Sequence, residues 1–461
     1  MWDTIQSLKN DCTGIIRIDD PGIITIIDEE NLRSTLLDKL VYNAVFNENE
    51  AVIIACRWIV RGVATAYGAV SSSIQELYEA MGRGEVSGFT VPAMNIRGTT
   101  YDVCRAAFRA ALKRNVGALI FEIAKSEIGY TKQRPTEYVT AVLGAALREG
   151  FRGPVFIQGD HFQAKAAGYF SDKEKEIAGL KSLIAEAIDA GFYNIDIDSS
   201  TLVILERSSE EEQQRDNFEV AAQMTEYIRN LEPEGITVSV GGEIGEVGGK
   251  NSTVEEFRVY MDGLNNALPQ GMKGISKISV QTGTSHGGVP LPDGSIAKVK
   301  LDFSVLEDIS KVGREEYGIS GTVQHGASTL PDELFHRFPE SEASEVHLAT
   351  GFQNIIYDHS IFPDDFKRRI YAYLKEHHAK EWKEGQTEEQ FIYKTRKKGF
   401  GPFKKEFWDL PDTVKAPIMS ALEDKFGFLY EQLRVVDTKE TVAKLVTSPI
   451  VLPPVPEDLL D

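Results

Sequence analysis

Short apolar runs alternate with longer amphipathic stretches between about residue 88 and residue 374. The apolar runs are rich in small and β-branched residues, which predicts β-strands. The stretches between them carry apolar residues near i, i+3, i+4 and i+7, which predicts amphipathic helices. The predicted strands are Gly88–Ile96, Val116–Ala124, Pro154–Asp160, Tyr193–Asp198, Thr237–Glu243, Lys277–Thr282, Gly318–Gln324 and Glu345–Thr350. The predicted helices include Thr100–Lys113, Glu137–Arg148, Glu174–Ala190, Glu210–Asn230 and Val254–Ala267.

This alternation has the size of a (β/α)8 barrel, which typically takes about 250 residues. An open, doubly wound sheet would alternate in the same way, so periodicity alone leaves both folds open. Polar residues at the carboxyl ends of many strands favour the barrel, because an open sheet concentrates its site at one switch point. These residues are Asn95, Glu122, Asp160, His161, Asp198, Glu243, His286 and His325. The sequence therefore predicts an α/β fold, a TIM barrel.

Helical extensions are predicted on both sides of the barrel. Before it, Leu32–Phe46 and Ala51–Ala66 have helical spacing, and Ser72–Met81 would be a short helix entering the barrel. After it, the chain is helical and polar, with a basic patch at Lys394–Lys405 and a proline-rich end at 449–456 that predicts extended backbone. The expected units are an N-terminal helical extension (1–85), the barrel (86–375) and a C-terminal helical extension with a proline-rich tail (376–461).

The composition of the chain limits which binding partners and which cellular compartment we expect. A formal net charge of −20 makes nucleic acid a poor partner. No apolar run approaches the roughly 20 residues of a membrane span, and the N-terminus lacks the features of a secretory signal. The three cysteines, Cys12, Cys56 and Cys104, are scattered, which fits a reducing compartment. We therefore expect a cytoplasmic protein without membrane or nucleic-acid partners, although local N–H groups and a few cations can still bind a phosphate.

Three of the eight histidines, His161, His286 and His325, follow predicted strands. Neutral imidazole is the commonest zinc ligand, and three protein ligands with one open position is the pattern of catalytic zinc. Each histidine alone is more simply explained as a loop residue with satisfied hydrogen bonds. Together, at one end of one barrel, they predict a metal site. Asp160, next to His161, is placed to relay protons as a general acid/base near that metal.

Two acidic residues are placed to approach the same cleft. Asp198 lies at a strand tip and could be a metal ligand, a partner of His161, or only the cap of the following segment. Glu243 opens a glycine-rich loop that could close over a substrate. At the end of that loop, the sequence predicts a helix cap at Ser252 or Thr253.

Small residues and a basic patch suggest sites for anions. Gly287 and Gly326 allow backbone N–H groups to approach a phosphate, and Ser328 adds a hydroxyl donor. His347 in the last strand is placed to line the barrel mouth. Since a second, distal phosphate on an acidic protein needs a local cation, we expect the basic patch, with Arg396, to reach the active site of its own or a neighbouring subunit. The alternative is a solvated run of charge.

An ordered set of motifs resembles the class II, zinc-dependent fructose-bisphosphate (ketose-bisphosphate) aldolases from about Gly88 to about Leu374. The motifs are Val91-Pro-Ala-Met-Asn, Gln158-Gly-Asp-His, Ile197-Asp-Ser-Ser, Gly242-Glu-Ile-Gly, Gly283-Thr-Ser-His-Gly, Gln324-His-Gly-Ala-Ser and Leu348-Ala-Thr-Gly. Each motif is common by itself, but their order is specific. The resemblance implies an aldolase-like barrel over 86–375, an oligomer of two or more copies, and a place in glycolysis and gluconeogenesis.

The resemblance also implies a role for each matched residue. Asp160 would be the acid/base, while His161, His286 and His325 would hold zinc. Glu243 and Asp198 would lie near an alternative position of the metal. The resemblance also allows a monovalent cation as a second cofactor. The implied substrate contacts are Asn95, Gly287, Gly326, Ser328 and Thr350. Zinc would stabilise the enediolate formed when fructose 1,6-bisphosphate splits into dihydroxyacetone phosphate and glyceraldehyde 3-phosphate.

The chain departs from the family at positions around the substrate. Lys250–Asn251 stand where the family's loop carries an acid, so Glu246 or another group must move the carbon-bound proton. His347 replaces an asparagine, and Glu122 and Ala124 replace glutamine and serine. These changes leave open an aldolase for another phosphorylated ketose, or a non-catalytic aldolase-like subunit or scaffold. A zinc hydrolase is a third reading, which the glycines suited to phosphate disfavour.

Overall fold

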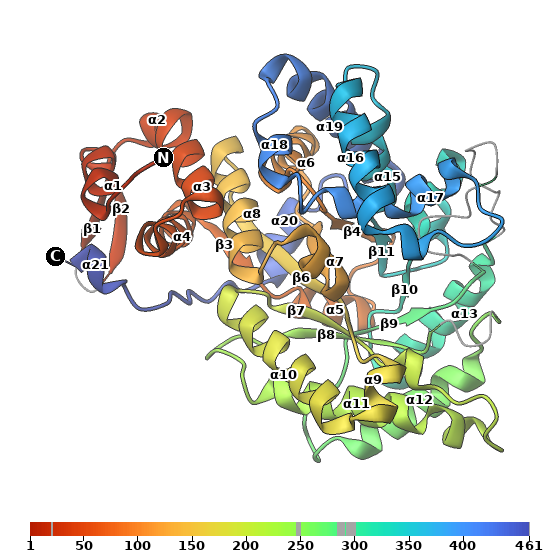
Figure 1. The fold of residues 1–461 in the computed structure, drawn as a ribbon. Coiled ribbons are helices and arrows are strands. Elements are labelled where there is room, and N and C mark those ends of the chain that lie inside the picture. The colour runs from red at the N-terminus through yellow and green to blue at the C-terminus, as the bar shows by residue number, and fades with distance from the viewer. Residues whose placement is uncertain (20–21, 246–249, 284–290, 292–300, 461) are drawn as a thin grey trace.

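Eight parallel strands form a closed barrel surrounded by helices, a (β/α)8 TIM barrel (Figure 1). The computed structural model describes residues 1–19, 22–245, 250–283, 291 and 301–460. Around the barrel the strands follow the order β4 (Val91–Asn95), β5 (Ile120–Ala124), β6 (Gly153–Gln163), β7 (Asn194–Asp198), β8 (Ser239–Glu243), β9 (Lys277–Val280), β10 (Thr322–Gln324) and β11 (Glu345–Leu348). Pairing of β11 with β4, Glu345 opposite Val91, closes the ring. The predicted fold is confirmed, and each predicted barrel strand is present.

The helices that pack around the barrel are α6 (Thr100–Lys113), α7 (Lys125–Thr131), α8 (Pro135–Glu149), α9 (Ala166–Ser171), α10 (Lys173–Ala190), α11 (Glu210–Arg229), α12 (Val254–Ala267), α13 (Phe303–Val312), α14 (Arg337–Glu340) and α15 (Thr350–Asp358). Among them, α6, α8, α10, α11 and α12, whose bounds were predicted, begin and end within about two residues of those bounds. Gly150 and Gly191, with φ of 81° and 105°, end α8 and α10 in the left-handed conformation that glycine adopts without strain. The predicted cap at Thr253 is a complete capping box with Glu256.

The N-terminal extension contains strands that the helical prediction omitted. β1 (Ile16–Asp19) and β2 (Ile23–Ile26) form an antiparallel hairpin, and β3 (Ala69–Ser72) pairs in parallel with β6 on the outside of the closed ring. The similarly short barrel strands β9, β10 and β11 were recognised from the repeated strand-and-helix alternation, and these three strands lie before it. The helices here are α1 (Ile5–Cys12), α2 (Glu29–Asn31), α3 (Leu37–Phe46), α4 (Glu50–Tyr67) and α5 (Gln75–Gly82).

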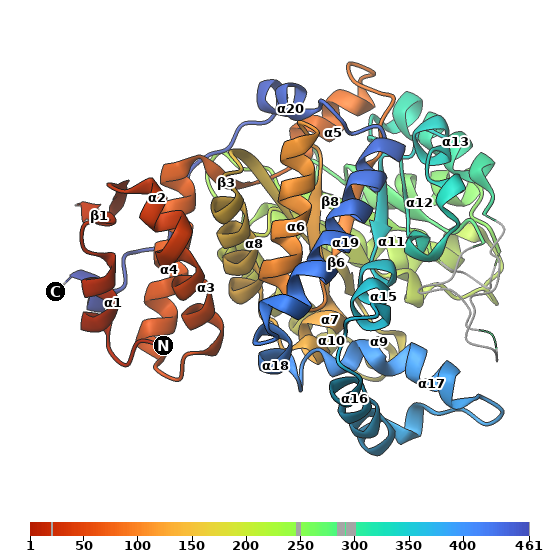
Figure 2. The same ribbon diagram turned by 90° about the horizontal axis from the view of Figure 1, so that it is seen from above.

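The C-terminal extension crosses the barrel and returns to the N-terminal one. Its helices are α16 (Asp364–His377), α17 (Glu388–Thr395), the 3-10 turn η8 (Arg396–Gly399), α18 (Lys404–Trp408), α19 (Asp412–Gln432), α20 (Lys439–Leu445) and α21 (Glu457–Leu460). Figure 2 shows α19 beside α6 and the last residues among the N-terminal helices. There the indole N–H of Trp58 donates to the Pro453 carbonyl at 3.0 Å. Among the described residues, no helix combines the length and apolar character needed to cross a bilayer.

Candidate active site

A bulge in β6 sets the directions of Asp160 and His161. The pairing of β6 with β7 shifts between Gly159 and Phe162, and His161 lies in the left-handed region with φ of 42°. A Cβ atom on Gly159 would lie 2.5 Å from the Phe162 ring, so the bulge needs glycine at that position. Bulges re-aim side chains next to active sites. Here the bulge lets two consecutive residues serve one site, Asp160 buried inside the barrel and His161 nearer the mouth.

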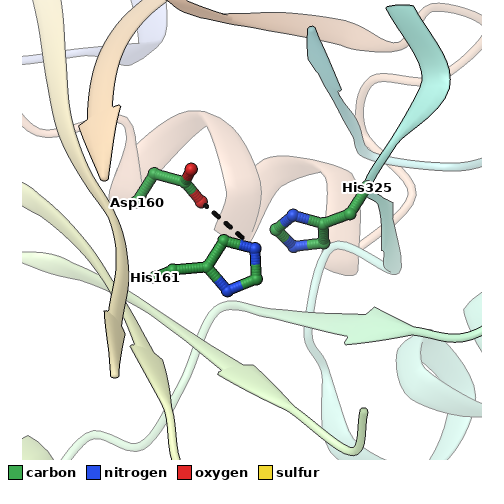
Figure 3. Close-up of side chains that lie close together, drawn as sticks. All are labelled: Asp160, His161 and His325. Atoms are coloured by element: carbon green, nitrogen blue, oxygen red, sulfur yellow. Dashed lines mark ion pairs between the residues drawn. The ribbon is translucent and has the colours of Figure 1, made fainter. Parts of the chain in front are cut away.

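His161 lies between two groups of possible metal ligands. On one side are Asp160 and His325, and the three residues place one ligand atom each within 4.8 Å of one another (Figure 3). On the other side, its Nδ1 lies 2.9 Å from Asp198 Oδ2 and 3.3 Å from Glu243 Oε2, a second group of the same compactness. Imidazole and carboxylate donors of this kind suit zinc. His286, the third expected histidine ligand, lies outside the described residues, as does Gly287.

The charges of this group perturb its pKa values. Burial by itself would raise the pKa of Asp160, but the neighbouring His161 and His347 hold it well below its ordinary range. Burial and the charge of Asp198 raise the pKa of Glu243 to about 7. The carboxylates raise the pKa of His161 well above its ordinary value, against the effect of burial. The carboxylates thus favour positive charge at His161. A proton on the imidazole can supply that charge, and so can a metal cation bound to the neutral imidazole.

Asp160 is held from two sides. The side-chain amide of Asn95 donates to its Oδ2 at 2.8 Å, and His347 Nδ1 lies 3.2 Å from its Oδ1. His347 is buried, and its ring centroid is 4.2 Å from that of His325. His347 lines the cavity, as expected, but it also positions the carboxylate expected to act as acid/base.

Below Asp160 the barrel interior holds an ionic network that sequence reasoning missed. Lys277 Nζ lies 2.6 Å from Glu345 Oε1 and 3.0 Å from Asp196 Oδ1, and all three side chains are buried. Glu345 also lies 2.6 Å from His347 Nε2, which joins the network to Asp160. Burial raises the pKa of Asp196 to about 6, whereas Lys277 and His347 lower that of Glu345 to about 2. In the sequence, this network could have been suspected from the charged residue at the start of each of two strands, β9 and β11.

A cavity of about 580 Å³ opens at the carboxyl ends of the strands. Its size is within the range of small-molecule sites, roughly 300–1,000 Å³. The expected residues that line it are Asn95, Asp160, His161, His325, Gly326, Ser328, His347 and Thr350. Lining residues that were not expected include Arg97, Lys125, Lys165 and Tyr130, whereas Lys397 belongs to the basic patch that was expected to reach the site. Asp198 and Glu243 do not line this cavity. They contact His161, which does.

The basic C-terminal segment reaches the cavity of its own chain, but not through Arg396. The Arg396 guanidinium lies 2.6 and 2.9 Å from the Asp358 carboxylate and 2.6 Å from Asn354 Oδ1. The next residue, Lys397, lines the cavity. In the glycine-rich loop, Lys250 is exposed and Asn251 lies 3.5 Å from Asp302. Glu246 lies outside the described residues.

Comparison with known proteins identifies the family. The family model of class II fructose-bisphosphate aldolases matches residues 75–398, and the chain belongs to that family. No curated protein matches the chain.

Two solved structures with TM-scores above 0.5 agree on the fold. The fructuronate–tagaturonate epimerase of Cohnella laeviribosi is 13% identical over 86% of this chain and 90% of its own, with a TM-score of 0.56. A probable tagatose 6-phosphate kinase of Sinorhizobium meliloti is 14% identical over 77% of this chain and 99% of its own, with a TM-score of 0.53. The fructose-bisphosphate aldolase of Campylobacter jejuni is 18% identical over 78% of this chain and 93% of its own, with a TM-score of 0.46. At these identities the similarity concerns the fold alone.

Proposed function

We propose that this chain is a metal-dependent aldolase that reversibly cleaves a ketose bisphosphate, with fructose 1,6-bisphosphate as the first candidate. The observation that carries the proposal is the grouping of Asp160, His161 and His325 at the mouth of the barrel, with ligand atoms within 4.8 Å of one another. These residues stand in motifs that resemble those of the family. The cavity beside them has the volume of a sugar phosphate site.

In the proposed reaction each side chain has a defined task. His161 and His325, with His286, would hold zinc, which when bound supplies a Lewis acid for the substrate carbonyl. Asp160 Oδ accepts the proton of the substrate hydroxyl whose carbon becomes the aldehyde, and it returns that proton in the synthetic direction. Asn95 and His347 keep the carboxylate in place and ionised for this transfer.

The test is cleavage of fructose 1,6-bisphosphate by metal-analysed protein, followed through a coupled assay for the triose phosphates. We expect activity that disappears on complete chelation and returns with added zinc. Activity that survives complete removal of the metal would refute the proposal.

A second candidate is an aldolase for another phosphorylated ketose. It is supported by two residues that differ from the family pattern: His347, which lines the cavity, and Glu122, whose Oε1 lies 3.2 Å from His347 Nδ1. A panel of phosphorylated ketoses separates this candidate from the first. The same panel tests the non-catalytic alternative, because turnover of any member by the purified chain excludes a scaffold without activity. The cytoplasmic location and the homo-oligomer stay predictions.

A further inference from the structure

Arg97 and Lys397 are two cations at one corner of the active-site cavity. Both line the cavity, Arg97 from the loop after β4 and Lys397 from η8 in the C-terminal extension. Arg97 donates from Nε to Glu127 at 2.6 Å and from Nη1 to the Thr350 hydroxyl at 3.1 Å. Within the described part of the chain, no hydrogen bond or ion pair joins Lys397 Nζ to another residue. One of the two cations is therefore anchored, and the other is available to a ligand.

The place of Lys397 is built into the packing of the C-terminal segment. A Cβ atom on Gly98 would lie 2.1 Å from the Phe400 ring, and one on Gly401 would lie 2.1 Å from the Tyr130 carbonyl oxygen. Glycine at both positions thus lets the segment pack directly against the loop after β4 and against α7. The segment is also tied to α8, where Lys404 Nζ lies 2.7 Å from Glu137 Oε1. These contacts hold the backbone after Lys397, and the ion pair of Arg396 with Asp358 holds the residue before it.

The corner has more positive than negative charge. Two carboxylates act on Lys397, and each already has a cation as partner: Glu127 is paired with Arg97, and Glu381 is paired with Lys398. Burial and the charge of Arg97 lower the pKa of Lys397 to about 8, in keeping with the absence of an ion pair to it among the described residues. An anion bound here would compensate both cations. The hydroxyls of Ser328 and Thr350, which line the same cavity, add donors for its oxygens.

We propose that Arg97 and Lys397 form a subsite for a phosphate group of the substrate, so that the C-terminal extension helps to determine substrate specificity. The assignment of that phosphate to a ketose rests on the proposed function. The subsite itself rests on the packing and the charges described above. Phosphate fits this corner better than a carboxylate because its three oxygens can meet two cations and two hydroxyls together.

Binding of inorganic phosphate to the full chain tests the subsite directly, by titration calorimetry. Lys397→Met should weaken phosphate binding about 10- to 100-fold, the range expected for one lost charge-assisted hydrogen bond. Lys397→Arg should stay within about threefold of the unchanged protein. Lys398→Met is the matched control, because Lys398 pairs with Glu381 and does not line the cavity. Thermal unfolding of each variant checks that the fold is kept.

The result that overturns the subsite is equal phosphate affinity in Lys397→Met and the unchanged protein. Stronger binding of gluconate than of phosphate would also overturn it, since that outcome assigns the corner to a carboxylate. Kinetics separate this proposal from the aldolase. If no ketose is cleaved while phosphate binding depends on Lys397, the aldolase proposal fails and the subsite stands. If a ketose bisphosphate is cleaved and Lys397→Met changes neither KM nor phosphate affinity, the subsite fails and the aldolase stands.

Discussion

Replacing Lys277 with methionine tests whether this lysine neutralises the buried carboxylates of the ionic network inside the barrel. The side chain of Lys277 is 1% exposed, and those of its partners Asp196 and Glu345 are 8% and 0% exposed. Methionine has a similar length and no charge, so the variant leaves two buried carboxylates without this cation. Breaking a buried pair in this way costs about 3–5 kcal/mol. That is a large part of the roughly 5–15 kcal/mol by which proteins are stable.

The assay is urea denaturation of metal-free protein, so that metal binding does not contribute. Lys273→Met is the control, because Lys273 pairs with Glu79 at the surface, where the side chains are 49% and 31% exposed. An exposed pair of this kind contributes about 0–1 kcal/mol. We expect Lys277→Met to lower the free energy of unfolding by several times the effect of the control. Equal effects of the two substitutions would refute the view that the network is desolvated and depends on Lys277.

Three further predictions concern the site. Asp160→Ala should lower turnover about 10²- to 10⁴-fold while bound zinc, measured by elemental analysis, stays the same; loss of the metal would instead make Asp160 a ligand. His325→Ala should lower the zinc content of purified protein, and unchanged content would exclude His325 as a ligand. Because the pKa of Lys397 is about 8, its charge is lost as pH rises through that value, so phosphate affinity should fall above pH 8. Arg97, Glu127, Tyr130, Lys398 and Glu381 are the charged or titratable groups around Lys397. Lys397→Arg should remove this fall, and an identical pH profile in that variant would contradict the assignment.

The barrel could be predicted from the sequence because its pattern is local and repeated. Each strand is a short apolar run followed by a polar residue, and closure brings those polar residues to one rim. For this reason Asn95, Asp160, His161 and His325, predicted separately, meet at one cavity. The hairpin β1–β2 was missed because it lies outside this repeat, which is what revealed the equally short strands β9 and β11.

The residues that the sequence did not reveal depend on contacts between distant segments. The basic patch was expected to reach the site through Arg396, but Lys397 lines the cavity instead, beside the packing of Phe400 against Gly98 that nothing in the local sequence indicates. Lys277 and Glu345 stand at the starts of strands, where a charged side chain usually faces solvent. Only closure of the barrel places them 2.6 Å apart in its interior.

The position of Lys397 also orders events during synthesis of the protein. All strands of the barrel, up to the end of β11 at Leu348, leave the ribosome before η8 does. The barrel can therefore close, with Asp160, His161 and His325 in place, while the cation that we assign to phosphate is still being translated. A nascent or truncated chain would then have the metal site but not the full substrate site. Completion of the active site is thus coupled to synthesis of the C-terminal extension.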